Sequence, residues 1–327
     1  MHSSFRTGLL SLRCSWPIAS KKRCWNKASR VLDQSIAYYT TIALTRDLPD
    51  SFGDAIVEHF EGGDNADVCM ATARRQHEDY VAAFREFGVP TLSLASATSL
   101  PDSVFVEDTA LVIRHQSNNS KTNDDASTKI MILQPGHENR QPEVQDIGAI
   151  LRRLYPKDQI SYMAELDKYA RCDGGDVMYT GRHLFVGVSE RTNEEALEVL
   201  ERYFDTMPLV PVVLPSNAPV LHLKSAVTHM DAQTLVAPTA PWASKMLRNM
   251  RATQLGYNVI RIPDVLACNL VALPENQGLL LQDTPCPESR QLLQEAAKER
   301  NIPFRWVDSS ELAKKDAALT CCSILLT

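Results

Sequence analysis

Short runs of β-forming residues recur in pairs along this chain, and an amphipathic segment follows each pair. The first pair covers 109–114 (TALVIR) and 129–134 (KIMILQ). The stretch between them, QSNNSKTNDDAST, has no apolar residue except one alanine, which predicts a loop. Apolar residues then return with a 3.6-residue period over 142–154, which predicts a helix. Two strands, a helix and a further β run form the unit that later segments repeat.

The second unit has predicted strands at 177–180 and 184–188, joined by a tight turn at Gly181. Its helix, near 194–205, is preceded by Thr192 with Glu195 three residues later, the spacing of a capping box. The third unit has strands near 225–230 and 234–238 and a helix near 242–255, and the fourth has strands near 269–273 and 278–282 and a helix near 287–299.

The fifth unit is split between two distant parts of the chain. A last strand at 322–327 needs a partner, and 36–45 (IAYYTTIALT) is the free candidate. A helix near 66–87 and a strand near 91–95 complete this unit. Five units at spacings of roughly 40 to 70 residues predict a closed α/β ring, in which pairing of the split unit removes the free sheet edges. A doubly wound sheet is the competing fold, but no GxGxxG follows a strand and no P-loop is present.

The first 35 residues differ from the rest, and we exclude them from the predicted domain, which covers 36–327. Residues 1–32 are rich in serine and in basic residues and contain no acidic residue. This composition is typical of a mitochondrial presequence, and a poorly ordered extension without an address is the alternative. We expect a cytoplasmic protein, and the basic N-terminus makes a mitochondrial location the alternative.

Composition excludes several classes of function. The 327 residues are 44% hydrophobic with a formal net charge of −6, which gives no basic footprint for nucleic acid. No apolar run reaches the roughly 18 residues that a membrane span needs. The eight cysteines form no CxxC pair and no zinc-type cluster with histidine, so we expect free thiols in a reducing compartment.

Residues with catalytic chemistry stand just before the predicted inner strands of four units, whose starts should face a common centre. They are Glu107 and Asp108, the stretch 173–176 (DGGD), His222 and Cys321. Cysteine and histidine in one site are the minimum for nucleophilic catalysis, and a carboxylate that orients the imidazole completes a triad. Each feature also has a plain structural interpretation, as buried filler, a structural histidine, a tight turn or a solvated acidic cap.

For the adjacent Cys321 and Cys322 the question is which of the two is catalytic and which is structural. If both lie in a β-strand, their side chains face opposite sides, so that one is core while the other faces a cleft.

The combination of these residues closely resembles the dimethylarginine dimethylaminohydrolases of the guanidino-group-modifying (pentein) superfamily. The resemblance runs from about residue 40 onward. It rests on ARRQHEDYV (73–81), LPDSVFVEDTALV (100–112), PGHENRQPEV (135–144), DGGDVMYTGRHLFVGVSERTN (173–193), LHLKS (221–225) and LTCCSILL (319–326). It implies a five-bladed, pseudo-symmetric α/β propeller, the pentein fold, in one domain. It also implies hydrolysis of a methylated arginine to citrulline and an amine.

The resemblance also implies roles for individual residues. Cys321 would be the nucleophile, His222 the general acid and base, and Asp173 the group that orients His222. The substrate-binding residues would be Glu107 and Asp108 at the guanidinium, Asp102 at the α-amino group, Arg191 with Arg140 at the α-carboxylate, and Val57 and Lys315 through their backbones. No metal and no organic cofactor is expected. The expected partner is a small-molecule substrate, without nucleic acid or membrane, and the protein is expected to be a monomer or homodimer.

One local detail bears on substrate choice. Arginine deiminases carry an H-x-D whose Asp holds the second side of an unsubstituted guanidinium, whereas this chain has His222-Leu223-Lys224. The missing carboxylate favours a methylated substrate, since no buried charge is left unpaired beside the methyl groups. An arginine or agmatine deiminase and an inactive ring that binds a partner or a cationic metabolite remain the alternatives. The chain also has Asp316-Ala317-Ala318 where relatives carry a glycine, which indicates a stiffer loop before Cys321.

Overall fold

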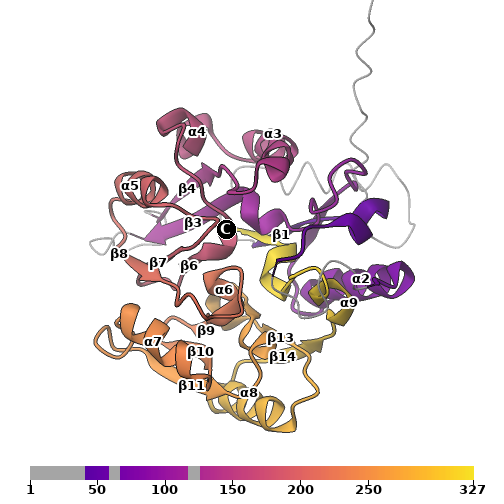
Figure 1. Cartoon of the computed structure of the whole chain (residues 1–327), viewed down its shortest axis with the longest axis vertical. Helices are drawn as coiled ribbons and strands as arrows, with labels where there is room; N and C mark the ends of the chain where they lie inside the picture. Colours follow the sequence, from indigo (N-terminus) through magenta and orange to yellow (C-terminus); the bar gives the residue numbers. More distant parts are fainter. Residues whose placement is uncertain (1–40, 59–66, 117–125) are drawn as a thin grey trace, which may run out of the picture.

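Five three-stranded sheets stand around a central axis (Figure 1). The computed structural model describes residues 41–58, 67–116 and 126–327 of the chain. Within each sheet the middle strand pairs antiparallel with the inner strand and parallel with the outer one. Listed from the axis outward, the sheets are β15 (Ile324–Leu326), β1 (Ile42–Arg46) and β2 (Thr91–Leu94); β3 (Ala110–Gln116), β4 (Ala126–Ile132) and β5 (Ile160–Tyr162); β6 (Val177–Tyr179), β7 (Leu184–Val188) and β8 (Leu209–Val213); β9 (Thr228–Asp231), β10 (Thr234–Pro238) and β11 (Asn258–Ile262); and β12 (Leu270–Ala272), β13 (Leu279–Gln282) and β14 (Phe304–Val307).

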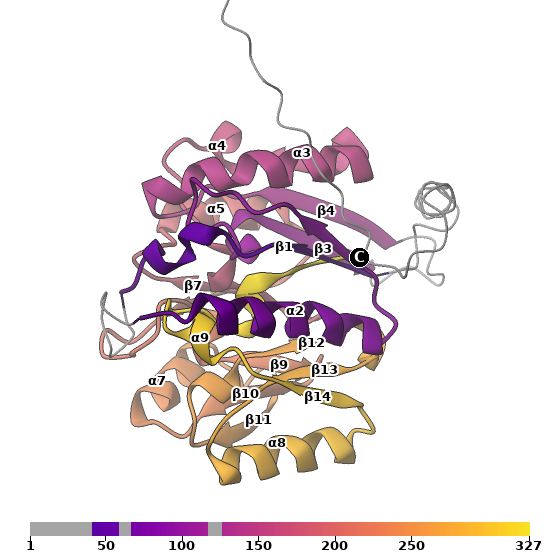
Figure 2. The same ribbon diagram turned by 90° about the vertical axis from the view of Figure 1, so that its right-hand side faces the viewer.

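A long helix connects the middle strand of each sheet to its outer strand and lies on the outside of the ring; Figure 2 shows α2 in this position. These helices are α2 (Met70–Glu86), α3 (Val144–Leu154), α5 (Glu194–Tyr203), α7 (Pro241–Asn249) and α8 (Pro287–Glu299). The shorter helices are α4 (Met163–Leu166), α6 (Leu223–Ala226) and α9 (Ser310–Ala313). The 3₁₀ helices are η1 (Asp50–Asp54), η3 (Val106–Thr109), η5 (Glu138–Glu143), η6 (Lys157–Gln159), η7 (Gly174–Asp176), η8 (Leu266–Cys268), η9 (Pro274–Asn276) and η10 (Leu319–Cys322).

The middle strands β7 and β10 are covered on both faces, which explains their largely apolar sequences. All five residues of β10 and four of the five in β7 are buried. On the outside of one blade, Ile147 and Leu151 of α3 pack in one core cluster with Ile130 and Ile132 of β4. Burying such a side chain contributes about 1.5–3 kcal/mol, so the 3.6-residue period read from 142–154 is the face that attaches the helix to its sheet.

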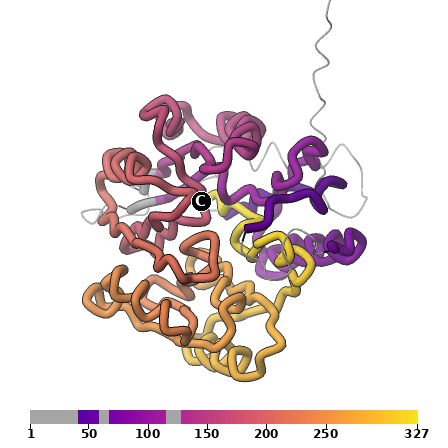
Figure 3. Tube along the Cα trace, viewed as in Figure 1, coloured from indigo at the N-terminus to yellow at the C-terminus, as the bar shows by residue number. Residues whose placement is uncertain are grey.

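The split fifth unit is confirmed. Ile324 pairs with Leu44 and Leu326 pairs with Ile42, so β15 and β1 lie side by side near the axis although they are far apart in the sequence (Figure 3). The closed ring of five units is therefore present, and the doubly wound alternative is wrong. One detail of the prediction is also wrong. The five sheets are separate in the described residues, so each keeps two edges rather than merging into an edgeless barrel.

Local boundaries differ from the sequence prediction at three places. Asn193 rather than Thr192 caps α5, because the Asn193 side chain accepts from the Ala196 amide while Thr192 donates to Asp176. The strand expected near 225–230 starts at residue 228, since 223–226 form α6. The helix expected to 255 ends at Asn249. Residues 1–40, and with them the N-terminal extension, lie outside the described residues.

Over the residues that the structure describes, no helix combines the length and the apolar character that a membrane crossing requires.

One buried hydrogen bond joins α2 to the residue before β15. The Tyr80 hydroxyl lies 2.7 Å from Ser323 Oγ, and both side chains are buried. We expect Tyr80→Phe to lower the free energy of unfolding by roughly 1–3 kcal/mol, because the Ser323 hydroxyl would stay buried without its partner. Urea unfolding followed by fluorescence measures this. Tyr169→Phe, at a side chain that is 63% exposed, is the matched control and should change little. Equal stability of the Tyr80→Phe protein and the wild type would contradict the expectation.

Candidate active site

The segments just before four inner strands meet at one end of the axis. Gly175 in η7 donates its amide to Asp108 Oδ1 in η3 at 2.8 Å. His222, just before α6, lies 3.0 Å through Nε2 from Asp173 Oδ2. Thr320 in η10 donates to Glu107 Oε2 at 2.9 Å. Direct hydrogen bonds therefore bring together groups from blades that are up to 213 residues apart in sequence, as the strand-start argument predicted.

His222 is almost fully buried among carboxylates. Burial on its own would lower the pKa of its imidazole, but Asp108, Asp173 and Asp176 raise the pKa to about 9. Asp173 is held in place on its other side, because Oδ1 accepts the amide of Gly136 at 2.8 Å. At neutral pH the imidazole is consequently protonated and able to donate, as a general acid must be.

Asp108 is the carboxylate to which most of these groups connect. Arg140 Nη1 lies 2.7 Å from Asp108 Oδ2, and the remaining Arg140 donors bond to Glu143 and to the Phe105 carbonyl. Burial would raise the pKa of Asp108, but His222 and Arg140 hold it at about 2. Arg140, which was predicted to bind a substrate carboxylate, is thus engaged with two carboxylates of the protein itself.

Glu107 is the second carboxylate, and a lysine and a threonine hold it. Lys224 Nζ lies 2.6 Å from Glu107 Oε1 while Thr320 bonds to the other oxygen. Burial raises the pKa of Glu107, and Lys224 opposes that rise. Asn269, before β12, donates to the Lys224 carbonyl and to Thr320 Oγ1 and accepts from the Thr320 amide. Sequence reasoning missed Asn269, although its place at the start of the fourth inner strand was a usable signal.

Cys321 and Cys322 lie in the 3₁₀ helix η10 and not in a strand, so the expectation that they alternate across a sheet is wrong. Both are buried, and both pack in the same hydrophobic core cluster. Burial raises the pKa of the Cys321 thiol, and Glu107 and Asp108 raise it further. Glu107 and Asp108 act in the same direction on Cys322. Asp108 thus raises the pKa of both cysteine thiols and of the His222 imidazole. The hydrogen bond from Thr320 to Glu107 joins the residue before Cys321 to the residue before Asp108.

Asp102 and Arg191 stand at the outer part of this site and contact a loop. Asp102 Oδ1 accepts the amide of Ile56 at 3.2 Å, and burial raises the Asp102 pKa. Arg191 Nη2 lies 2.6 Å from Glu58 Oε1, and its Nη1 is 3.6 Å from Asp173 Oδ2. The structure therefore gathers all of the predicted polar site residues except Lys315 into one connected cluster.

Val57 and Lys315 belong to two loops that touch one another. The amide of Glu58 donates to Asp316 Oδ2 at 2.6 Å, which ties 55–58 to the loop before Cys321. Val57 is half-buried and Lys315 is 3% exposed. The Lys315 side chain makes no hydrogen bond or ion pair within the described residues. Asp316, the residue before Ala317 and Ala318, adopts a left-handed φ of 55°.

The two glycines of DGGD are required by close packing. A Cβ on Gly174 would lie 2.0 Å from the Glu107 carbonyl oxygen, and one on Gly175 would lie 2.6 Å from His222 Nδ1. Backbone and imidazole therefore occupy the space that any other residue would fill, so glycine here does more than permit a turn.

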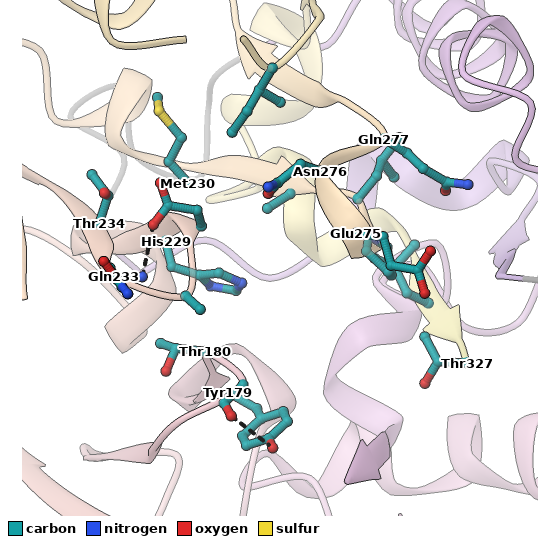
Figure 4. Close-up of a pocket in the computed structure, with 18 of the residues that line it drawn as sticks. Tyr179, Thr180, His229, Met230, Gln233, Thr234, Glu275, Asn276, Gln277 and Thr327 are labelled. Carbon is teal, nitrogen blue, oxygen red and sulfur yellow. Dashed lines mark hydrogen bonds between the residues drawn. The ribbon is translucent and has the colours of Figure 1, made fainter. Parts of the chain in front are cut away.

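A narrow cavity of about 190 Å³ leads away from Glu107, Lys224 and Thr320 between the five inner strands. It opens into a basin of about 1060 Å³ at the opposite ends of those strands, lined among others by Tyr179, His229 and Gln277 (Figure 4). The basin is the larger space, but the groups with acid–base and nucleophilic chemistry stand at the other end. The side chains present, rather than the cavity volume, therefore identify the candidate active site.

The ligand atoms of Asp108, Asp173 and His222 lie within 4.8 Å of one another, a spacing that a metal ion could use. The same atoms already bond to Arg140, Gly175 and Gly136 or to each other. A guanidinium beside the cluster already supplies the positive charge that a cation would bring. These residues are accordingly explained as a proton-handling site, and the absence of a metal stays a prediction.

A sequence profile of the family described as N,N dimethylarginine dimethylhydrolase, eukaryotic, matches residues 51–279. The N(G),N(G)-dimethylarginine dimethylaminohydrolase of Streptomyces coelicolor is 28% identical over 286 residues, covering 87% of this chain and 96% of that protein. The protein of the same name from Pseudomonas aeruginosa is 27% identical over 258 residues, covering 78% and 88%.

Solved structures give the same fold. A mutant of the Pseudomonas aeruginosa protein complexed with citrulline has a TM-score of 0.68 at 24% identity, covering 88% of this chain and 100% of its own. The N-terminal domain of ArgZ bound to product, from an arginine dihydrolase of cyanobacteria, has a TM-score of 0.68 at 16% identity, covering 88% and 98%. The predicted pentein propeller is confirmed.

The raised pKa of His222 makes stability depend on pH. A folded-state pKa of about 9 against 6.5 in the unfolded chain gives stabilisation that is complete below pH 6.5 and is lost as pH rises through about 9. At about 1.4 kcal/mol per pKa unit, this is on the order of 3 kcal/mol. We expect urea unfolding of wild type to lose more free energy between pH 6.5 and 9 than that of His222→Asn.

His183→Asn is the matched control, because burial lowers the pKa of His183, so that loss of its proton does not destabilise the fold as pH rises. Parallel pH curves for wild type and His222→Asn would contradict the assignment of a protonated His222.

Proposed function

The chain belongs to the N,N dimethylarginine dimethylhydrolase family of eukaryotes, and we propose that it hydrolyses Nω,Nω-dimethyl-L-arginine and Nω-monomethyl-L-arginine to L-citrulline and dimethylamine or methylamine. One observation carries the assignment of the chemistry to residues. Thr320, next to the buried Cys321, bonds to Glu107, while Gly175, which packs against the protonated His222 imidazole, bonds to the adjacent Asp108. Nucleophile, general acid and a site for a cation are thereby combined in one cluster.

Substrate charge activates the nucleophile. In the free protein Cys321 is a thiol, because burial and two carboxylates raise its pKa. A bound guanidinium brings a positive charge next to Glu107 and Asp108 and so favours loss of the thiol proton. The carboxylates keep lone pairs for the substrate beyond the bonds they already make, since each oxygen has two. Thiolate thus forms when a cationic substrate is present to react with it.

The reaction then proceeds in two halves. The Cys321 thiolate attacks the guanidinium carbon and forms a tetrahedral adduct, and His222 donates its proton to the departing dimethylamine. A covalent thiouronium remains on Cys321. His222, now neutral, accepts a proton from water as the water adds to the thiouronium carbon. Collapse of the second adduct breaks the carbon–sulfur bond, the hydroxyl proton of the adduct passes to the departing sulfur, and citrulline and the Cys321 thiol are released. General acid–base help of this kind is worth roughly 10²–10⁴-fold.

His222 Nε2 is committed to Asp173, which leaves Nδ1 for proton transfer. The Asp173 hydrogen bond fixes the ring in one orientation and stabilises its charged form, the part that the third member of a triad performs.

Lys224 supports methylated arginine over arginine as the substrate. It stands two residues after His222, where an arginine deiminase would offer a second carboxylate, and its ammonium pairs with Glu107. A guanidinium with two free amino groups would lack an acceptor on that side, whereas a dimethylated nitrogen needs none. A pair of citrulline assays, on arginine and on dimethylarginine, tests this choice.

We keep the remaining expectations as proposals. The partner of the protein is a small-molecule substrate, and the protein is a monomer or a homodimer. Its location is the cytoplasm, with mitochondria as the alternative. No metal or organic cofactor enters the proposed reaction.

The roles of the two adjacent cysteines can be separated by substitution. We expect Cys321→Ser to lower citrulline formation from dimethylarginine by roughly 10³-fold or more, because a neutral hydroxyl replaces the nucleophile. Cys322→Ser, the matched control one residue away, should keep turnover once thermal melting shows that it has folded. Full activity in Cys321→Ser together with loss in Cys322→Ser would reverse our assignment.

Close packing at Gly175 gives a second test. A methyl group there would meet His222 Nδ1, so we expect Gly175→Ala to lower kcat by about 10²-fold through displacement of the imidazole. Gly53→Ala is the control, since a Cβ at Gly53 meets nothing within 4 Å. Steady-state assays of both variants measure the effect. If the Gly175→Ala variant had wild-type kcat, the proton-transfer role of Nδ1 would be wrong.

A further inference from the structure

Glu58 forms an ion pair with Arg191, the residue for which the family resemblance implies contact with the substrate α-carboxylate. Its Oε1 lies 2.6 Å from Arg191 Nη2, in an ion pair whose arginine side chain is 5% exposed and whose glutamate side chain is 30% exposed. A carboxylate on a buried guanidinium makes a strong charge-assisted hydrogen bond. A substrate carboxylate that reaches Arg191 therefore meets another carboxylate already there.

The same loop also occupies the group assigned to the α-amino end. The amide of Ile56 donates to Asp102 Oδ1 at 3.2 Å. An N–H on Asp102 and a carboxylate on Arg191 are the two contacts that an α-amino acid would make with these residues. The segment 56–58 thus imitates the amino-acid end of the proposed substrate, and the bond from the Glu58 amide to Asp316 holds it there.

Arg140 offers no substitute for Arg191. Its guanidinium bonds to Asp108, to both oxygens of Glu143 and to the Phe105 carbonyl. Arg191, by contrast, keeps one donor nitrogen, Nη1, that is buried and has no hydrogen-bond partner within the described residues. Nη1 lies 3.6 Å from Asp173. A carboxylate of the substrate can bond to Nη1, but it must then share a single guanidinium with Glu58.

We propose that Glu58 is a specificity-determining residue that competes with the α-carboxylate of the substrate for Arg191. This inference rests on the proposed function. Glu58 weakens the binding of guanidines that carry an α-carboxylate. It does not weaken the binding of guanidines that lack a carboxylate. Such a ligand leaves the Glu58–Arg191 pair in place. Its amine meets the same Ile56–Asp102 bond as the amine of an amino acid, so the two kinds of ligand differ only at Arg191.

Steady-state kinetics of Glu58→Gln with two substrates tests the proposal. For asymmetric dimethylarginine we expect KM to fall by roughly 3- to 30-fold, the range for loss of a half-exposed charged hydrogen bond. The effect falls on KM rather than on kcat. For its decarboxylated analogue, an N,N-dimethylguanidino butylamine, KM should stay unchanged or rise. Asp54→Asn, which removes the same charge four residues earlier from an exposed position, is the control and should alter neither KM.

Three results would overturn the inference. They are an unchanged KM for dimethylarginine in both Glu58→Gln and Glu58→Ala, an equal fall in KM for both substrates, and the same fall in Asp54→Asn. Calorimetry of dimethylarginine binding in a Cys321→Ser background keeps this outcome separate from the proposed function. Absence of citrulline from wild type contradicts the function, whereas equal dissociation constants with and without Glu58→Gln contradict the inference alone.

Discussion

The arrangement of the candidate site depends on the buried carboxylate of Asp108. It is 1% exposed, and an amide from η7, a guanidinium from η5 and an imidazole from the start of α6 surround it. A buried anion is costly unless it is paired and hydrogen-bonded. Asp108 is therefore stable in its charged form when these segments are in position around it. The relative placement of the blades at this end of the axis and the ionisation state of the site depend on the same set of bonds.

Most of the buried carboxylates at the candidate site are paired with cationic side chains. Glu107 is opposed by Lys224, Asp108 and Glu143 by Arg140, and Asp173 by His222. Burial and residual negative potential keep the Cys321 thiol protonated, so the resting protein carries an unreactive sulfur and a protonated His222. A neutral or anionic molecule would not change this state. In the proposed mechanism, selectivity for cations thus arises in the activation of the nucleophile as well as in binding.

Much of the fold and of the candidate site could be predicted from the sequence, because it depends on local pattern. The 3.6-residue period of α3 and the apolar run of β7 each report the face that is buried. The strand-start argument located Glu107, Asp108, Asp173, His222 and Cys321 together, since inner strands of a ring share one end. Their partners were not readable. Glu58 pairs with Arg191 across 133 residues and Lys224 with Glu107 across 117, and no periodicity encodes such distances. The cysteines were misplaced for a related reason, because a 3₁₀ turn that leads into a short strand has no distinct hydrophobic period.

The split blade has a consequence for how the protein is made. Leu44 in β1 pairs with Ile324 in β15, about 280 positions further along the chain. At ribosomal rates of 5–20 residues per second, the early strand waits on the order of 15–60 s with one side unpaired. Contacts between such remote residues also slow folding, since a long loop must close before they form. Cys321 is synthesised within the same late stretch as β15. A nascent chain therefore acquires Cys321 and the closing strand β15 together, and shorter intermediates have neither.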